Sequence, residues 1–80
     1  MKDKIKQILS ENADISVDEL NSLSPDGLLS ELGLDSLNIM YVIAEIEQEF
    51  QFRFEEDDMV FKNFATLDMV ENMINKYIRR

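Results

Sequence analysis

Apolar side chains recur at helical spacing in three stretches of the chain, residues 4–12, 37–50 and 67–78. Spacings of three and four residues place such side chains on one face of a helix, with charged residues on the other. The first stretch carries Ile5, Ile8 and Leu9. The pattern therefore predicts three amphipathic helices.

The middle helix has the clearest start. Asp35 and Ser36 are both suited to its N-cap position, because a short polar side chain there accepts a hydrogen bond from a free backbone N–H. Either residue is a candidate cap. The face expected to turn toward the core consists of Leu37, Met40, Ile43, Ala44, Ile46 and Phe50.

The last helix is expected to begin after Thr66, which is another preferred N-cap residue. Arg79 and Arg80 follow at its C-terminal end, where positive charge is favourable. Its inward face is expected to carry Leu67, Val70, Met73, Ile74, Tyr77 and Ile78.

The segment between the first two helices is long but not featureless. Ser16 and Glu19 have the spacing of a capping box, which indicates either a further helical turn or an ordered loop. The Ser-Pro-Asp-Gly run at 24–27 predicts a turn. Four leucines in this segment are expected to pack on the core: Leu28, Leu29, Leu32 and Leu34.

The segment after residue 50 alternates aromatic and polar side chains through Phe52 and Phe54, as a strand would. No second run is available to pair with it, so we expect an extended connection that buries its aromatic rings. Residues 56–61 are expected to form one short helical turn. The chain is thus predicted to be a single all-α domain, residues 1–80, with three main helices, one short helix and a long structured loop between the first two main helices.

Composition narrows the range of functions. The chain contains no cysteine and no histidine, which removes disulfides, thiolate nucleophiles, the Ser-His-Asp arrangement and the usual zinc ligands. A basic start without an apolar run after it predicts no signal peptide. With no stretch of eighteen apolar residues, we expect no membrane span and a cytoplasmic protein.

The formal charge of −9 is large for 80 residues. It argues against nucleic-acid binding, because phosphates would be repelled. It favours partners with basic surfaces, although solubility alone would also account for it.

Ser36 is the residue with the most chemical promise. A hydroxyl at a helix start sits near free backbone N–H groups that attract anions, which suits a phosphoryl group attached to the side chain. The plain alternative is an N-cap serine that only stabilises the helix.

The run Leu-Gly-Leu-Asp-Ser-Leu at 32–37, supported by residues 47–50 at the end of the same helix, resembles the acyl carrier proteins. The resemblance extends over residues 5–78. It implies a four-helix bundle whose long first loop ends in Asp-Ser-Leu at the start of the second helix.

The resemblance also implies a function. Ser36 would be esterified with 4′-phosphopantetheine by a phosphopantetheinyl transferase that uses coenzyme A as donor. The thiol of this arm holds acyl groups as thioesters and carries them between enzymes of fatty-acid, lipid or polyketide synthesis. The carrier would be a non-catalytic monomer, and its partners would be acyl-loading, condensing and acyl-transfer enzymes with basic docking patches.

Site residues follow from the same motif. Asp35 would assist the transferase through its magnesium ion, which would belong to that transient complex and not to this protein. The residues expected to contact partners are Leu37, Asn38, Met40, Tyr41, Glu45 and Glu47.

Two of those positions depart from the family pattern. The family often has acidic residues two and five positions after the serine, where this chain has Asn38 and Tyr41. Fewer charges should weaken steering toward generic basic partners, while Tyr41 offers an aromatic anchor. We therefore expect a carrier dedicated to a particular pathway.

Two further features allow more than one interpretation. Methionine and aromatic residues along the chain either line an acyl pocket or only fill the core: Met40, Ile43, Met59, Phe61 and Ile74. The acidic run at 55–58 lacks the spacing of a calcium loop and is interpreted as a solvated helix start.

Two alternative functions remain open at this stage. The first is an aminoacyl or peptidyl carrier with the same cofactor, although such carriers tend to show a Gly-Gly-(His or Asp)-Ser type of motif. The second is an acidic helical interaction module that is never modified.

Overall fold

The computed structural model describes residues 1–79. It contains the α-helices α1 (Lys2–Ala13), α2 (Val17–Ser22), α3 (Asn38–Phe50) and α4 (Leu67–Ile78). Three 3₁₀ turns join them: η1 (Leu29–Leu32), η2 (Glu56–Asp58) and η3 (Phe61–Phe64). The all-α prediction is confirmed.

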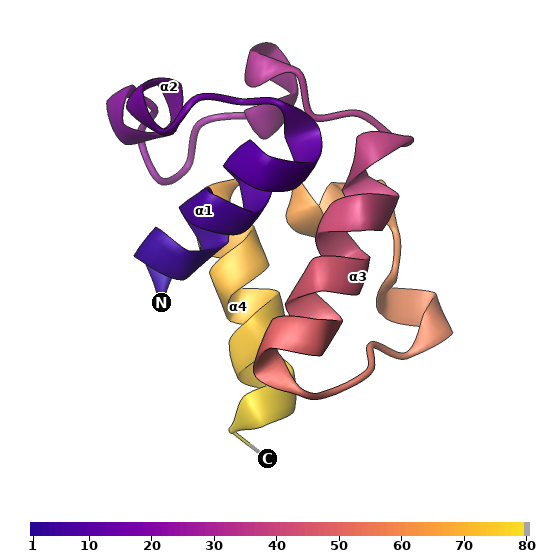
Figure 1. Cartoon of the computed structure of the whole chain (residues 1–80). Helices are drawn as coiled ribbons and strands as arrows, with labels where there is room; N and C mark the ends of the chain where they lie inside the picture. Colours follow the sequence, from indigo (N-terminus) through magenta and orange to yellow (C-terminus); the bar gives the residue numbers. More distant parts are fainter. Residues whose placement is uncertain (80) are drawn as a thin grey trace.

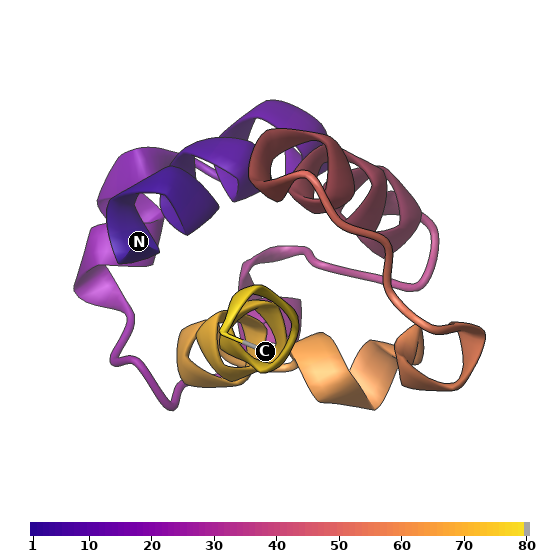
Figure 2. The same cartoon turned by 90° about the horizontal axis from the view of Figure 1, so that it is seen from below.

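The helices form two layers around one core. α1 packs on α3 and α4, and α2 lies beside α1 in the long first loop (Figure 1). Seen from below, α1 and α3 form one layer, while α4 and the turns before it lie opposite (Figure 2). None of the helices in residues 1–79 combines the length and the apolar character that crossing a bilayer takes.

Every long element contributes to the core, and so do the loops. Phe64 of η3 and Leu29 of η1 are completely buried, like the central residues of the helices. Burying one such side chain is worth about 1.5–3 kcal/mol, so the connections contribute to stability as the helices do. The completely buried helical residues are Ile5, Leu9, Leu20, Val42, Ile46, Val70 and Ile74.

Both short helical segments that the sequence indicated are present. The first is α2, which is closed by the Ser16–Glu19 capping box: Glu19 N–H donates to Ser16 Oγ (3.1 Å) and Ser16 N–H donates to Glu19 Oε1 (3.2 Å). The second is the expected short turn in 56–61, which is the 3₁₀ turn η2; η3 begins at the end of the same region.

The inward face of α3 differs from the predicted one. Leu37, Met40 and Ala44 are exposed, Leu37 and Met40 by 71% and 67%. Ile39 and Val42 take the inward positions together with Ile43 and Ile46. The first half of α3 is apolar on every side and allows either face. In its second half only Ile46 and Phe50 are apolar, and they continue the three- and four-residue spacing of Ile39, Val42 and Ile43.

The connections follow the prediction in most places. Gly27 N–H donates to the Ser24 carbonyl at 2.8 Å, which closes the predicted turn. Leu29 and Leu34 are buried, whereas Leu28 is half exposed and was wrongly expected to pack inward.

The aromatic connection and the last helix also agree with the sequence in outline. Phe54 is buried, and Phe52 stacks on Tyr77 with ring centroids 5.1 Å apart. Thr66 caps α4 by accepting from Met69 N–H at 3.1 Å. Ile78 is exposed and not inward as expected. The end of α4 is followed by Arg79, and Arg80 lies outside the described residues.

Candidate functional site

The loop before α3 is anchored on its upstream side by Gly33 and Leu34. Gly33 ends η1 with φ at +116°, a conformation that side chains rarely adopt, although open space surrounds its missing Cβ. Glycine is therefore required by the backbone and not by crowding. Leu34 then turns into the core, with only 2% of its surface exposed. Gly33 and Leu34 therefore determine where Asp35 and Ser36 lie on the surface.

Asp35 caps the turn of residues 36–37 that leads into α3. Its Oδ1 accepts from the backbone N–H groups of Leu37 (2.9 Å) and Asn38 (2.8 Å), and its carbonyl accepts from Ile39 N–H (3.0 Å). Ser36, the other candidate cap, makes no such contact and is the first residue of the opening turn.

This cap changes the electrostatic argument for Ser36. Two of the N–H groups that were expected to attract an anion already bind the Asp35 carboxylate. The negative charge of Asp35 also offsets the positive end of the helix. The helix terminus alone is therefore a weak reason to expect phosphate at Ser36.

The side chain of Asn38 forms a hydrogen bond with the backbone of Asp35, reciprocal to the one that the Asp35 side chain accepts from Asn38 N–H. Its Oδ1 accepts from Asp35 N–H at 2.8 Å, and its Nδ2 donates to the Gly33 carbonyl at 3.0 Å. The side chain is half buried. The Asp-x-x-Asn spacing of a reciprocal cap was visible in the sequence, but Asn38 was interpreted only as a partner contact.

Ser36 projects from this loop into solvent. Within the described chain, nothing hydrogen-bonds to its hydroxyl, and no side chain is positioned to remove its proton. The geometry suits a point of attachment rather than a nucleophile activated from within the chain.

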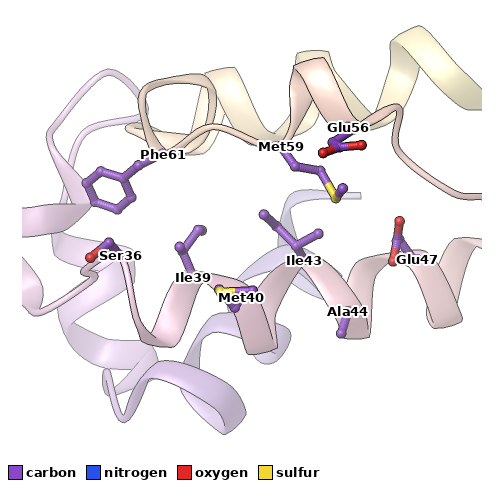
Figure 3. Close-up of a pocket in the computed structure, with 9 residues that line it drawn as sticks. All are labelled: Ser36, Ile39, Met40, Ile43, Ala44, Glu47, Glu56, Met59 and Phe61. Atoms are coloured by element: carbon purple, nitrogen blue, oxygen red, sulfur yellow. The ribbon is translucent and has the colours of Figure 1, made fainter.

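An apolar groove of about 480 Å³ opens beside Ser36. Figure 3 shows α3 as one wall and the 56–61 segment as the other, with Ser36 and Phe61 at one end and Glu47 and Glu56 at the opposite end. Its other lining residues are Ile39, Met40, Ile43, Ala44 and Met59.

Four of the five residues expected to line a pocket are found in this groove. The exception is Ile74, which is completely buried in the core, so its prediction as a lining residue was wrong. The sequence missed Ile39, Ala44 and Glu56, because only packing decides which sides of α3 and the 56–61 segment face each other.

The expected partner contacts fall into two groups. Leu37, Met40 and Tyr41 lie on the outer side of α3, with 71%, 67% and 63% of their surfaces exposed. Glu45 is half exposed near them, whereas Glu47 Oε2 accepts from Phe54 N–H at 2.8 Å. Glu47 thus also ties the following connection to α3.

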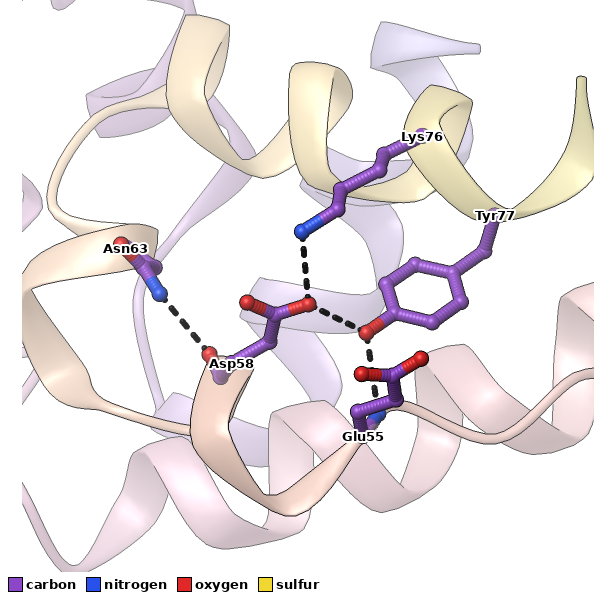
Figure 4. Close-up of polar contacts among 5 residues, drawn as sticks. All are labelled: Glu55, Asp58, Asn63, Lys76 and Tyr77. Atoms are coloured by element: carbon purple, nitrogen blue, oxygen red, sulfur yellow. Dashed lines mark hydrogen bonds and ion pairs between the residues drawn. The ribbon is translucent and has the colours of Figure 1, made fainter.

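A polar cluster holds the 56–61 wall against α4 (Figure 4). Asp58 Oδ2 pairs with Lys76 Nζ at 2.8 Å and accepts from the Tyr77 hydroxyl, while Glu55 N–H donates to that hydroxyl at 2.9 Å. Asn63 Nδ2 donates to the Asp58 carbonyl at 3.0 Å. Asp58 is therefore a structural anchor, whereas the side chains of Glu55, Glu56 and Asp57 are exposed at the start of η2, as the sequence predicted.

The same cluster shifts two ionisation equilibria. Burial raises the pKa of the Tyr77 hydroxyl, and the hydrogen bond to Asp58 raises it further. The hydrogen bond to Asp58 likewise raises the pKa of Lys76. No local pattern would have revealed these contacts, because 18 and 19 residues separate the partners.

The comparisons with known proteins identify the family. A family model described as the phosphopantetheine attachment site matches residues 3–74. The chain belongs to the acyl carrier protein family. It is 32% identical to the acyl carrier protein of Karelsulcia muelleri over 75 residues, which cover 94% of this chain and 86% of the relative.

Two solved structures share the fold of this family member. The holo acyl carrier protein of Nitrosomonas europaea superimposes with a TM-score of 0.82 at 21% identity, covering 99% of this chain and 96% of that one. The second structure is an engineered Bradyrhizobium japonicum glycine:[carrier protein] ligase in complex with a carrier protein from Agrobacterium tumefaciens and AMP. One of its chains superimposes with a TM-score of 0.83 at 23% identity, covering 94% of this chain and 99% of that one.

Family membership defines the class of function. The protein is a non-catalytic carrier of the family whose model describes a phosphopantetheine attachment site. In the described part of the chain, no three acidic side chains come together in a way that would hold a metal ion.

Proposed function

We propose that Ser36 bears the phosphopantetheine arm and that the protein carries acyl intermediates between enzymes of fatty-acid, lipid or polyketide synthesis. It would act as a monomer in the cytoplasm. The observation that carries the proposal is the exposed Ser36 hydroxyl, which makes no hydrogen bond within residues 1–79 and lies at one end of an apolar groove.

The residues around Ser36 fit such an arm. The hydroxyl is open to solvent, so a phosphodiester can form there without displacing a side chain. When attached, the arm supplies a thiol that holds the acyl group as a thioester. The chain itself presents Ser36 on a fixed loop and contributes no general base, so a transferase has to supply the base and to bind coenzyme A.

Asp35 is proposed to have two roles. One carboxylate oxygen, Oδ1, caps the turn that leads into α3, and no group in the described chain hydrogen-bonds to Oδ2. This second oxygen is adjacent to the attachment residue and is available to the transferase's magnesium ion. Carboxylate oxygens are preferred magnesium ligands.

The outer side of α3 is proposed as the docking surface for the transferase and for acyl-loading, condensing and acyl-transfer enzymes. Leu37, Met40 and Tyr41 form an exposed apolar strip next to Ser36, with Glu45 beside it. A partner with an apolar pocket and a basic rim would match this surface. Tyr41 would be its aromatic anchor, which supports a carrier dedicated to one pathway.

An NMR titration with an enzyme of the same gene neighbourhood tests the docking surface. Tyr41→Ala should weaken binding by about tenfold, as expected for the loss of an aromatic anchor. Gln48→Ala, an exposed change on the same helix, should leave it unchanged. Equal affinities of the two variants would argue against Tyr41 as an anchor.

An aminoacyl carrier is the second candidate function. The structural similarity to a chain in the complex with a glycine:[carrier protein] ligase supports it. The apolar groove next to Ser36 favours an acyl cargo instead, because a small polar aminoacyl group gains little from an apolar lining.

Intact-protein mass spectrometry tests the attachment itself. Incubation with coenzyme A and a broad-specificity transferase should add one phosphopantetheine group to the parent protein and none to Ser36→Ala. Ser30→Ala, which removes another exposed serine, should still be modified. A parent protein that gains no mass would contradict both carrier functions.

The cargo is then tested on the modified protein. An octanoyl thioester should shift the methyl signals of Met40 and Met59 in the groove, whereas a glycyl thioester should not. Identical spectra for the two cargoes would remove the support that the groove gives to the acyl function.

A further inference from the structure

We propose that Asn38 is a positioning residue for modification of Ser36 and not a docking contact. The proposal rests on the attachment of the arm to Ser36. It is carried by one amide side chain that bonds to the backbone on both sides of Leu34: Asp35 N–H donates to Oδ1 at 2.8 Å, and Nδ2 donates to the Gly33 carbonyl at 3.0 Å.

These bonds require an amide. One partner is an N–H group and the other is a carbonyl, so the side chain has to accept and donate at the same time. A carboxylate at position 38 would keep the bond to Asp35 N–H. However, it would place a negative oxygen against the Gly33 carbonyl. An apolar side chain would lose both bonds.

The bonds close a ring around the segment from which Ser36 emerges. Asn38 holds Gly33 and Asp35, and its own N–H donates to Asp35 Oδ1. The side chain of Leu34, which lies between them in the sequence, is buried in the core. The Ser36 side chain makes no hydrogen bond within the described residues, so its position depends on these neighbours. A loop that is ordered in advance reduces the entropy lost when a partner enzyme aligns the hydroxyl for reaction.

Positioning and docking make opposite predictions for Asn38→Asp. If residue 38 contacts basic partners, an added carboxylate strengthens steering and speeds modification. If residue 38 positions Ser36, the same change removes a donor and slows modification. The second outcome is the one we expect.

The experiment measures kcat and KM of a phosphopantetheinyl transferase, with coenzyme A, on the full chain and its variants. Asn38→Asp should lower kcat/KM about threefold to tenfold, the effect of losing roughly one hydrogen bond, and Asn38→Ala should lower it further. The loss should lie mainly in kcat, because the exposed apolar strip of α3 is unchanged. It should also persist at high salt, where steering is screened.

Gln48→Glu is the matched control. It adds the same charge to an exposed position of α3 that has no hydrogen bond to the loop, so its kcat should equal that of the parent. An Asn38→Asp variant modified as fast as the parent, or faster, would overturn the proposal.

Amide hydrogen exchange provides a readout that does not involve the transferase. Asn38→Ala should accelerate exchange of the Asp35 N–H about tenfold or more, because its acceptor is lost, while Asn38→Asp should leave that N–H protected. An unchanged Asp35 N–H in the alanine variant would also overturn the proposal. A parent protein that is never modified would instead contradict the attachment at Ser36, so the two failures are distinguishable.

Discussion

Two substitutions of Asp35 distinguish its role in helix stability from its proposed role in recognition by the transferase. Asp35→Ala removes the Oδ1 atom that accepts from Leu37 and Asn38 N–H, and the reciprocal contact with Asn38 loses its support. Asp35→Asn keeps an oxygen of the same reach and removes only the negative charge. Asparagine is among the best N-cap residues.

The expected loss in the free energy of unfolding follows from those hydrogen bonds. Loss of an N-cap side chain costs about 1–2 kcal/mol, which lowers the melting temperature of a domain this small by roughly 4–16 °C. Asp35→Asn should cost about 0.5 kcal/mol, since only the charge–dipole contribution is lost. Modification of Ser36 should nevertheless slow by about tenfold or more in both variants, because a neutral amide is a poor magnesium ligand.

The assay combines thermal unfolding by circular dichroism with the rate of phosphopantetheine transfer. Asp18→Asn, which removes the same charge at an exposed site in α2, serves as the control for net charge. If Asp35→Ala melts within a degree or so of the parent, the capping argument is wrong. If Asp35→Asn is modified at the parent rate, Asp35 has no role in the transferase complex.

Three further outcomes are expected. Val42→Ala should cost about 2 kcal/mol in urea unfolding, because two buried methyl groups are lost, whereas the exposed Met40→Ala should cost less than about 0.5 kcal/mol; equal costs would mean that α3 is rotated. In a Tyr41→Phe background, the near-ultraviolet phenolate signal should show Tyr77 titrating above its ordinary pKa of 10.0. The Tyr77 hydroxyl therefore loses its proton at a lower pH in the unfolded state than in the folded state. Its contribution to the free energy of unfolding is present below about pH 10 and disappears as the pH rises through the folded-state pKa. A free energy of unfolding that does not fall in that range would contradict the burial of Tyr77. Because the net charge is −9, salt should raise the melting temperature, and a melting temperature that ignores ionic strength would refute this.

Local chemistry made several structural features predictable. Ser16 with Glu19 and Thr66 act within three residues of their partners, so their caps are visible in the sequence. The same holds for the Ser-Pro-Asp-Gly turn and for the Asp-Ser-Leu motif. The Asp35–Asn38 pair has the same short range, yet its meaning was missed because position 38 was considered only for its charge.

Features that depend on which surfaces meet were not predictable in the same way. The first half of α3 is apolar on every side, so only the spacing that leads on to Ile46 indicates that Val42 is buried and Met40 exposed. The groove needs the 56–61 segment opposite α3, and that segment is held by Asp58 against Lys76 and Tyr77 of α4.

The sequence by itself therefore determined the helices, most of their ends and the carrier motif at Ser36, because helix periodicity and capping act over a few residues. Only the tertiary structure decided that the 56–61 segment lies opposite α3 to form the groove, and that Asp58 anchors this segment to Lys76 and Tyr77 of α4. The physical reason is that burial and hydrogen bonding between distant segments select one arrangement among several with equal local preference.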